Sequence, residues 1–191
     1  MNSTEAKTHD VAAEPQLVLE ELGHVAGSVR SEQISLLVDK VTSHARIFVY
    51  GTGRSGLMLK AFAMRLMQTG ITSYVVGETT TPAIRPGDLL VVASASGETG
   101  SVLLTAQAAD KQGADLLVIT ASPMSSLAKI RRPDIVIESG TKEHASTASK
   151  QPLGSLFEQA LLLLFDSIVL AMEHRGKATA AAMAARHASL E

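Results

Sequence analysis

The sequence predicts one α/β domain in which helices cover both faces of a parallel sheet. Short apolar runs alternate along the chain with longer segments of helical periodicity, which is typical of right-handed βαβ units. The run over residues 88–93 is apolar at nearly every position, as expected of a strand that is covered on both faces. A chain of 191 residues with 46% hydrophobic content suits one compact domain better than two.

The first half of the chain contains three of the expected strands and two helical regions. Residues 1–14 are small and polar, and we expect them to form a flexible terminus. Apolar positions then recur at helical spacing over residues 15–43, which predicts one long or broken helix. A second helix is predicted over residues 53–69, followed by Gly70 in a position that ends helices. Apolar, β-branched and aromatic runs predict strands over residues 46–50, 73–76 and 88–93.

The second half of the chain continues the alternation. Two more strands are predicted, over residues 115–120 and 134–137. The predicted helices are residues 98–112, 125–130 and 153–173, together with an alanine-rich tail over residues 177–190. The polar stretch 138–151 is expected to be a long loop, and long loops in compact domains are often functional. A single domain over residues 15–191, with extra helices at both ends, is therefore predicted.

Composition excludes several classes of protein. A net charge of −2 and a pI near 6.3 argue against a broadly basic nucleic-acid surface. The absence of cysteine excludes disulfides, cysteine-ligated zinc and thiol catalysis, and the six histidines show no H-x-x-x-H or H-E-x-x-H spacing, so we expect no metal site. Asp166 and Glu173 interrupt the apolar stretch that begins at Ala160, so we expect no membrane span. The first residues lack the features of a secretory signal, which favours a cytoplasmic protein.

A glycine-rich loop, GTGRSG, follows the first predicted strand and opens a helix. It matches the G-x-G-x-x-G pattern of dinucleotide sites, and Glu78 lies where a ribose-binding acid is expected, about 20 residues on. A nicotinamide-dependent enzyme is therefore one hypothesis. The other is a turn whose glycines serve packing alone.

A second loop, with the sequence SASGET over residues 94–99, follows the third predicted strand. Its hydroxyls could serve as a helix N-cap, but three hydroxyls and a glycine exceed what one cap requires. A helix N-terminus with short hydroxyl side chains favours a phosphate group. Because no lysine follows as in a nucleotide P-loop, we expect the monophosphate of a small molecule.

The chain resembles the sugar isomerase (SIS) domain family over essentially its whole length, from about Gln16 to Glu191. The resemblance rests on four segments: GTGRSG, GETTTPAIRPGDLLVVASASGET, QPLGSLFEQALLLLFD and RHASLE. The S-x-S-G-E-T motif is typical of phosphosugar-binding SIS domains in general. The longer GETTTPAI block and PLG-x-LFEQ are most similar to the 6-phospho-3-hexuloisomerase branch of the family.

The resemblance implies a five-stranded flavodoxin-like sheet in a three-layer αβα sandwich, and a cofactor-free isomerase. The implied reaction converts D-arabino-3-hexulose 6-phosphate into fructose 6-phosphate through an enediolate, in formaldehyde fixation by the ribulose monophosphate pathway. It also implies a homo-oligomer, a dimer or tetramer with active sites at subunit contacts, and makes a hexulose phosphate synthase a candidate partner. Arabinose 5-phosphate or sedoheptulose 7-phosphate isomerase, and a non-catalytic phosphosugar sensor, are the alternatives.

Matching positions carry the family roles to this chain. The phosphate-binding hydroxyls are expected at Ser55, Ser94, Ser96 and Thr99. Glu158 matches the catalytic carboxylate, and we expect Leu153, Phe157 and Leu161 to desolvate it. The alternative for Glu158 is a buried helical acid paired with an arginine or lysine.

The remaining candidates surround these two loops. Arg54 would neutralise phosphate or polarise the sugar carbonyl, and Glu78 would bind sugar hydroxyls or hold Arg54. A hydroxyl at Thr79 is a candidate oxyanion donor, and Gly53 is expected to contact substrate. Two histidines complete the prediction. His144, in the long loop, is a candidate substrate contact, and His187, in the tail, would reach the site of a neighbouring subunit.

Overall fold

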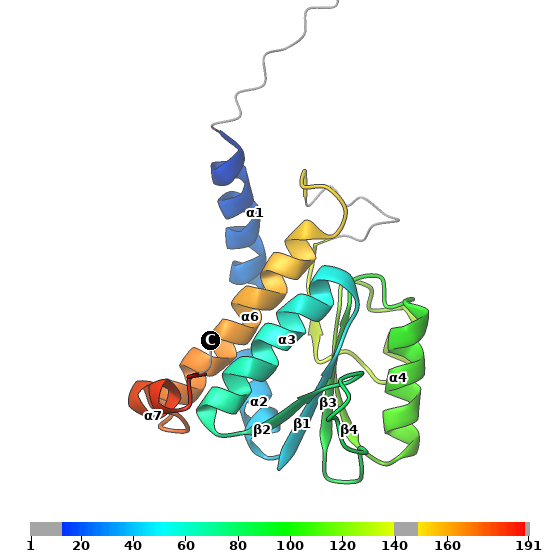
Figure 1. Cartoon of the computed structure of the whole chain (residues 1–191). Coiled ribbons are helices and arrows are strands. Elements are labelled where there is room, and N and C mark those ends of the chain that lie inside the picture. Colours follow the sequence, from blue (N-terminus) through cyan, green and yellow to red (C-terminus); the bar gives the residue numbers. More distant parts are fainter. Residues whose placement is uncertain (1–12, 140–148, 190–191) are drawn as a thin grey trace, which may run out of the picture.

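The five strands form one parallel sheet in the order β2-β1-β3-β4-β5, as described by a computed structural model that covers residues 13–139 and 149–189 (Figure 1). The strands are β1 (Arg46–Tyr50), β2 (Thr72–Val75), β3 (Leu89–Ser94), β4 (Asp115–Thr120) and β5 (Ile135–Val136). This order is that of flavodoxin-like sheets, so the predicted fold class is confirmed. The chain leaves β1 toward one edge of the sheet and leaves β3 toward the other.

Helices cover the two faces of the sheet unequally (Figure 1). One face carries α1 (Glu14–Ser28), α2 (Ser31–Thr42), α3 (Gly53–Thr69) and α6 (Ser155–His174). The other carries α4 (Gly100–Lys111) and α5 (Ser126–Ile130), while α7 (Ala180–Ala185) packs against α3. The predicted three layers are therefore present, with the larger apolar core under α3 and α6.

Alternate residues of each strand enter the two cores, as the pleat of a strand requires. In β3, Leu89 and Val91 belong to the larger core, whereas Leu90 and Val92 belong to the smaller one. All six residues of β3 are buried, which confirms the strand predicted from its continuous apolar run.

The longest helix, α6, is apolar enough to cross a membrane by length and composition, with a mean hydropathy of 1.7. We expected Asp166 and Glu173 to interrupt this apolar stretch too early for it to span a membrane, but the helix is long and apolar enough by this measure. However, 61% of its apolar window is buried inside the domain, where α6 packs against α1, α2 and α3. Its apolar character therefore follows from its place in the core.

Several element boundaries differ from those predicted. The first helical region, predicted as one long or broken helix, is broken: Arg30 has extended backbone, and its N–H donates to the Gln33 side chain at the start of α2. Strand β5 is only two residues long, although the N–H groups of Asp134 and Ile137 on either side of it donate to the carbonyl oxygens of Val118 and Thr120. The Asp134 carboxylate accepts in addition from the N–H of Val118 at 2.9 Å. The alanine-rich tail forms only the six residues of α7, which Thr179 caps.

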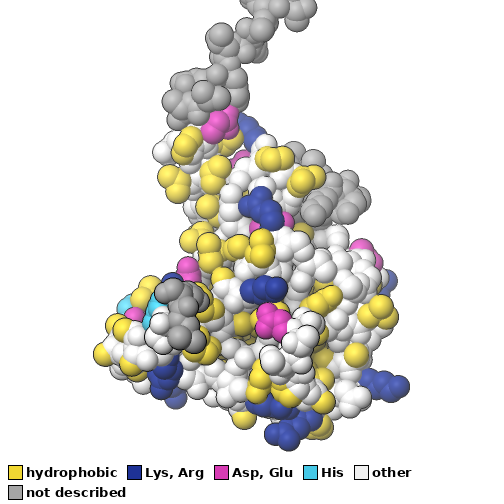
Figure 2. Space-filling view, viewed as in Figure 1, with side chains coloured by type: hydrophobic (Ala, Val, Ile, Leu, Met, Phe, Trp, Pro, Cys, Tyr) yellow, Lys and Arg dark blue, Asp and Glu magenta, His cyan; other side chains and the backbone are white. Residues whose placement is uncertain are grey.

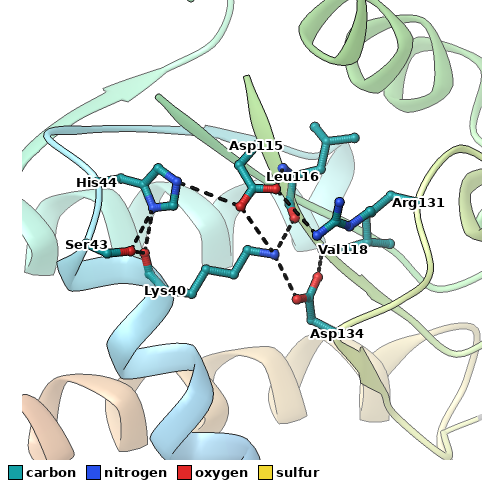
Figure 3. A network of polar contacts seen from close by, with 8 residues as sticks. All are labelled: Lys40, Ser43, His44, Asp115, Leu116, Val118, Arg131 and Asp134. Carbon is teal, nitrogen blue, oxygen red and sulfur yellow. Dashed lines mark hydrogen bonds and ion pairs between the residues drawn. The ribbon is translucent and has the colours of Figure 1, made fainter. Parts of the chain in front are cut away.

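A polar network joins the end of α2 to the amino ends of β4 and β5 (Figure 3). Lys40 Nζ donates to the carbonyl oxygen of Leu116 at 2.6 Å and to Oδ1 of Asp134 at 2.9 Å. Its side chain is only 15% exposed, so these contacts replace most of the water that would otherwise solvate the cation. The network holds the amino end of the short edge strand β5. It therefore lies at the end of the sheet opposite the loops that follow β1 and β3.

Candidate active site

A cavity of about 250 Å³ lies where the loops after β1 and β3 meet the start of α6. Ligands of open parallel sheets bind beyond the carboxyl ends of the strands where the chain reverses direction, and β1 and β3 form that point here. The cavity is lined by Thr52, Ser55, Ala93, Ser94, Ala95, Ser96, Thr99, Gly154 and Glu158. Five of the predicted site residues therefore share one cavity.

Three helices begin at this cavity. Their N-cap residues are Thr52 for α3, Thr99 for α4 and Gly154 for α6, and all three line it. None of these residues caps its helix with a side-chain hydrogen bond. The first backbone N–H groups of the three helices, with their partial positive charge, are thus directed toward a common space that favours an anion.

The glycines of the first loop allow β1 and α3 to approach closely. A Cβ atom at Gly56 would lie 2.5 Å from the carbonyl oxygen of Gly51, and one at Gly51 would lie 2.7 Å from Leu59 Cδ1. Gly53 has a left-handed φ of +57°, which glycine adopts without strain. This tight turn brings the half-buried Ser55, in the first turn of α3, to the cavity.

The second loop is held by its own side chains. Ser94 Oγ accepts from the N–H of Gly97 at 3.1 Å and lies 3.0 Å from Thr99 Oγ1. Ser96 Oγ accepts from the N–H of Glu98 at 3.2 Å. Gly97 is required here, because a Cβ atom would lie 2.1 Å from Ser125 Oγ. The loop therefore presents its hydroxyls in a defined arrangement.

Glu98 fastens this loop to α5, a role that our sequence analysis missed. Its Oε1 accepts from the N–H of Ser126 at 2.7 Å. Hydrogen bonds from the hydroxyl and the N–H of Ser126 hold the pKa of the Glu98 carboxyl below its usual value. The only sequence signal is an acid within a hydroxyl-rich loop, and its partner lies 28 residues away.

Glu158, on α6, lines the same cavity as the loop after β3, and it is paired. Its side chain is 9% exposed, and its Oε2 lies 2.9 Å from Nε of Arg54, whose side chain is 56% exposed. Arg54 Nη1 also donates to Ser155 Oγ at 3.2 Å. Burial of Glu158 is confirmed, and the structure pairs Arg54 with Glu158, where we had considered Glu78. Leu153 is 74% exposed and thus does not desolvate the carboxylate as expected.

Other predicted residues lie away from the cavity. Glu78 and Thr79 are exposed in the turn after β2, and neither they nor Gly53 line it. His187 follows α7, whose Arg186 contacts the carbonyl oxygen of Gln68 at the far end of α3, so it does not reach the cavity of its own chain.

Two further points concern cofactors and the long loop. His144 lies outside the described residues, so its predicted role stays a prediction. Within residues 13–139 and 149–189, no three His, Asp or Glu side chains are grouped so that they could hold a metal ion.

Comparisons with known proteins agree with this geometry. The SIS domain family matches residues 40–163, which contain both loops and Glu158. The 3-hexulose-6-phosphate isomerase of Mycobacterium gastri is 40% identical over 95% of this chain and 92% of its own length. The protein of the same name from Bacillus subtilis is 39% identical over 97% and 100%, respectively.

A solved structure shows the same architecture. A protein of Methanococcus jannaschii, whose crystal structure is described as inferring a molecular function of 3-hexulose-6-phosphate isomerase, is 29% identical with a TM-score of 0.79. The alignment covers 93% of this chain and 99% of that protein. With its sheet order, its hydroxyl-rich loop and its similarity to these relatives all in agreement, the chain belongs to the SIS domain family.

Proposed function

We propose that this chain is a cofactor-independent isomerase that converts D-arabino-3-hexulose 6-phosphate into fructose 6-phosphate. The observation that carries the proposal is the placement of the buried Glu158 carboxylate in the same cavity as the hydroxyls of the loop after β3. A base and an anion site within one small cavity suit a substrate that has a phosphate at one end and an acidic C–H bond at the other. The relatives named 3-hexulose-6-phosphate isomerase align over nearly the full chain, which supports this choice of substrate.

The phosphate would bind at the start of α3 and α4. Ser55, Ser94, Ser96 and Thr99 all line this part of the cavity and supply hydroxyl groups. The N–H groups of the first turns add donors and partial positive charge. Anchoring the phosphate fixes the carbon chain relative to Glu158, so that phosphate binding contributes to the chemical step.

Glu158 would then move one proton between adjacent carbons. Its carboxylate removes the proton from C2 of the 3-ketose, and the electron pair of the broken C–H bond forms a C2–C3 double bond with a negative charge on O3. The O2 proton passes to the adjacent O3, so that C2 becomes a carbonyl and O3 a hydroxyl, and the protonated carboxyl returns its proton to C3. One carboxylate therefore suffices, without an oxidant or a cofactor.

Arg54 would stabilise the oxyanion. It lies against Glu158, and its side chain is more than half exposed, so its guanidinium has freedom to move toward a bound substrate. A cation beside the developing negative charge on O3 lowers the barrier to enediolate formation.

The substrate itself explains why few groups are needed. A C3 ketone could close a five-membered ring only through O6, and O6 carries the phosphate. The substrate is therefore open-chain, and the forward reaction requires no ring-opening acid.

We further propose a homo-oligomeric, cytoplasmic enzyme of the ribulose monophosphate pathway, with a hexulose phosphate synthase as its candidate partner. Figure 2 shows hydrophobic side chains over the face made by α1, α6 and α3. The large apolar residues exposed on α3 and α6 are Leu57, Met64, Met67, Leu162, Leu163 and Leu170. An oligomer would cover them and bring Glu78, Thr79, His144 or His187 to a neighbouring site.

A coupled assay tests the proposed function. A hexulose phosphate synthase supplies substrate from ribulose 5-phosphate and formaldehyde, and phosphoglucose isomerase with glucose-6-phosphate dehydrogenase reports the product. We expect NADPH formation that depends on the chain. Activity only on arabinose 5-phosphate or sedoheptulose 7-phosphate would move the assignment to a related isomerase, binding without turnover would indicate a sensor, and tight NADH binding would indicate a nicotinamide enzyme.

A further inference from the structure

Glu21 is a buried carboxylate that belongs neither to the cavity nor to the apolar core. It lies on α1, a helix with only one other buried residue, Val25, and its exposure is 8%. Burying a carboxylate is costly unless hydrogen bonds replace its water. A role in stabilising α1 alone would be served better by an apolar side chain at this position.

Three donors from one short segment, residues 149–151, meet this carboxylate. Its Oε1 accepts from the backbone N–H of Lys150 at 2.6 Å. Its Oε2 accepts from Ser149 Oγ at 2.7 Å and from Gln151 Nε2 at 2.9 Å. Burial by itself raises the pKa of Glu21, but these bonds outweigh it and hold the pKa below its usual value. The carboxylate is therefore charged at neutral pH.

The anchored segment leads directly into the start of α6. Ser155 Oγ donates to the carbonyl oxygen of Pro152 at 2.9 Å and accepts from Arg54 Nη1 at 3.2 Å. Arg54 in turn holds Glu158. A chain of contacts thus runs from the anchored segment to the proposed catalytic carboxylate.

The same turn contains the one described non-glycine residue with a left-handed backbone, Leu153, with a φ of 59°. Such a conformation costs a leucine roughly 1–2 kcal/mol and persists only where the surrounding structure imposes it. Leu153 is largely exposed, so its own side chain does not impose it. The turn is held instead from its two ends, by Glu21 on one side and by α6 on the other.

We propose that Glu21 is a positioning residue for the isomerisation: by holding residues 149–151 it sets the start of α6, and thereby the places of Gly154 and Glu158 in the cavity. Figure 1 shows α1 beside the amino-terminal half of α6 and the segment that precedes it. Glu21 itself does not line the cavity and touches no reacting atom. The inference rests on the function proposed above.

Kinetics of Glu21→Ala test this role, with Glu20→Ala as the matched control, since Glu20 is an exposed acid on the same helix. We expect kcat of Glu21→Ala to fall about 10-fold at a temperature well below its melting point, because small displacements of a catalytic group are costly, while KM changes less than 3-fold. Glu21→Gln, which keeps an acceptor oxygen, should recover part of this loss. Adding Gln151→Ala to Glu21→Ala should cause no further loss, since the two residues act through one contact.

Amide hydrogen exchange gives a readout that does not depend on turnover. Exchange over residues 149–158 should be several-fold faster in Glu21→Ala than in the wild type, and unchanged in Glu20→Ala. Unchanged exchange, or faster exchange with wild-type kcat, overturns the inference alone. A wild-type chain without isomerase activity overturns the proposed function, and the catalytic part of this inference with it.

Discussion

Nε of Arg54 lies 2.9 Å from Oε2 of Glu158, and the pair bridges the first turns of α3 and α6. The two partners are unequal, because the carboxylate is buried and the guanidinium is more than half exposed. Because the guanidinium is solvated, it can turn toward a substrate oxyanion in the proposed reaction while it stays beside the buried carboxylate. In the proposed mechanism, the pair therefore holds the Glu158 carboxylate in place without preventing it from acting as the base.

Glu158→Gln should keep phosphosugar binding and lose turnover. The amide has nearly the same shape but cannot accept the C2 proton, so kcat is expected to fall roughly 10²–10⁴-fold while KM stays within a few-fold. Steady-state kinetics in the coupled assay measure both. Asp166→Asn, an exposed position on the same helix, is the control and should retain wild-type kcat. A normal kcat in Glu158→Gln removes this residue from the mechanism.

Ser96→Ala combined with Thr99→Ala should mainly weaken substrate binding. Hydrogen bonds to a charged group contribute about 1.5–3 kcal/mol, which corresponds to roughly a 10- to 100-fold rise in KM. Thr105→Ala lies on the same helix but donates to the carbonyl of Ser101, and should leave KM unchanged. An unaltered KM in the double variant would place the phosphate elsewhere.

Gly97→Ala should destabilise the loop after β3 and with it the domain. A Cβ atom there would collide with Ser125, in addition to the strain of a φ of +65°. We expect the free energy of unfolding to fall by about 3 kcal/mol, of which about 1–2 kcal/mol is strain. Gly176→Ala separates the two effects, because its φ is +67° and its Cβ would meet nothing within 4 Å. Urea denaturation of both variants should show a clearly smaller loss for Gly176→Ala.

Lys40→Met should destabilise the domain without changing its chemistry. The substitution leaves Asp134, which is only 21% exposed, without its cation, at an expected cost of about 2–3 kcal/mol. Because Lys40 lies at the opposite edge of the sheet from the cavity, kcat of the folded variant should equal that of the wild type. Thermal unfolding and the coupled assay together measure this, and a loss of kcat at low temperature would contradict it.

Stability should decline in acid through Asp88. Burial raises the pKa of this carboxyl, but hydrogen bonds from the Arg46 side chain and the Arg85 N–H outweigh it and lower the pKa below its ordinary value of 3.8. Because the pKa of Asp88 is lower in the folded state than in the unfolded state, its stabilising effect is complete above its pKa in the unfolded state. The effect is lost as the pH falls through its pKa in the folded state. The difference in unfolding free energy between the wild type and Asp88→Asn should therefore shrink below about pH 4. A constant difference down to pH 2 would contradict this.

The strands and the two loops were predictable because their signals are local. A strand buried on both faces needs apolar residues in succession, and the loops at its end need glycines and hydroxyls within a few positions. The contacts of Asp134 beside the short β5 were not predictable, since its carboxylate accepts from Lys40 and from the N–H of Val118, which only the folded sheet brings together. The contact of Arg186 with the carbonyl oxygen of Gln68, 118 residues away, was likewise not predictable from the alanine-rich tail.

The sequence alone determined the order of the elements, the hydroxyl-rich loop and Glu158 as an acid among apolar neighbours, because each follows from residues that are close together in the chain. Only the tertiary structure decided that Arg54 is the partner of Glu158, that Glu98 accepts from the N–H of Ser126 in α5 and that Glu21 is buried. In each case a carboxylate finds its donors 28 to 130 residues away. Periodicity shows that a residue lies on a helix, but which charged group neutralises another depends on how the helices pack.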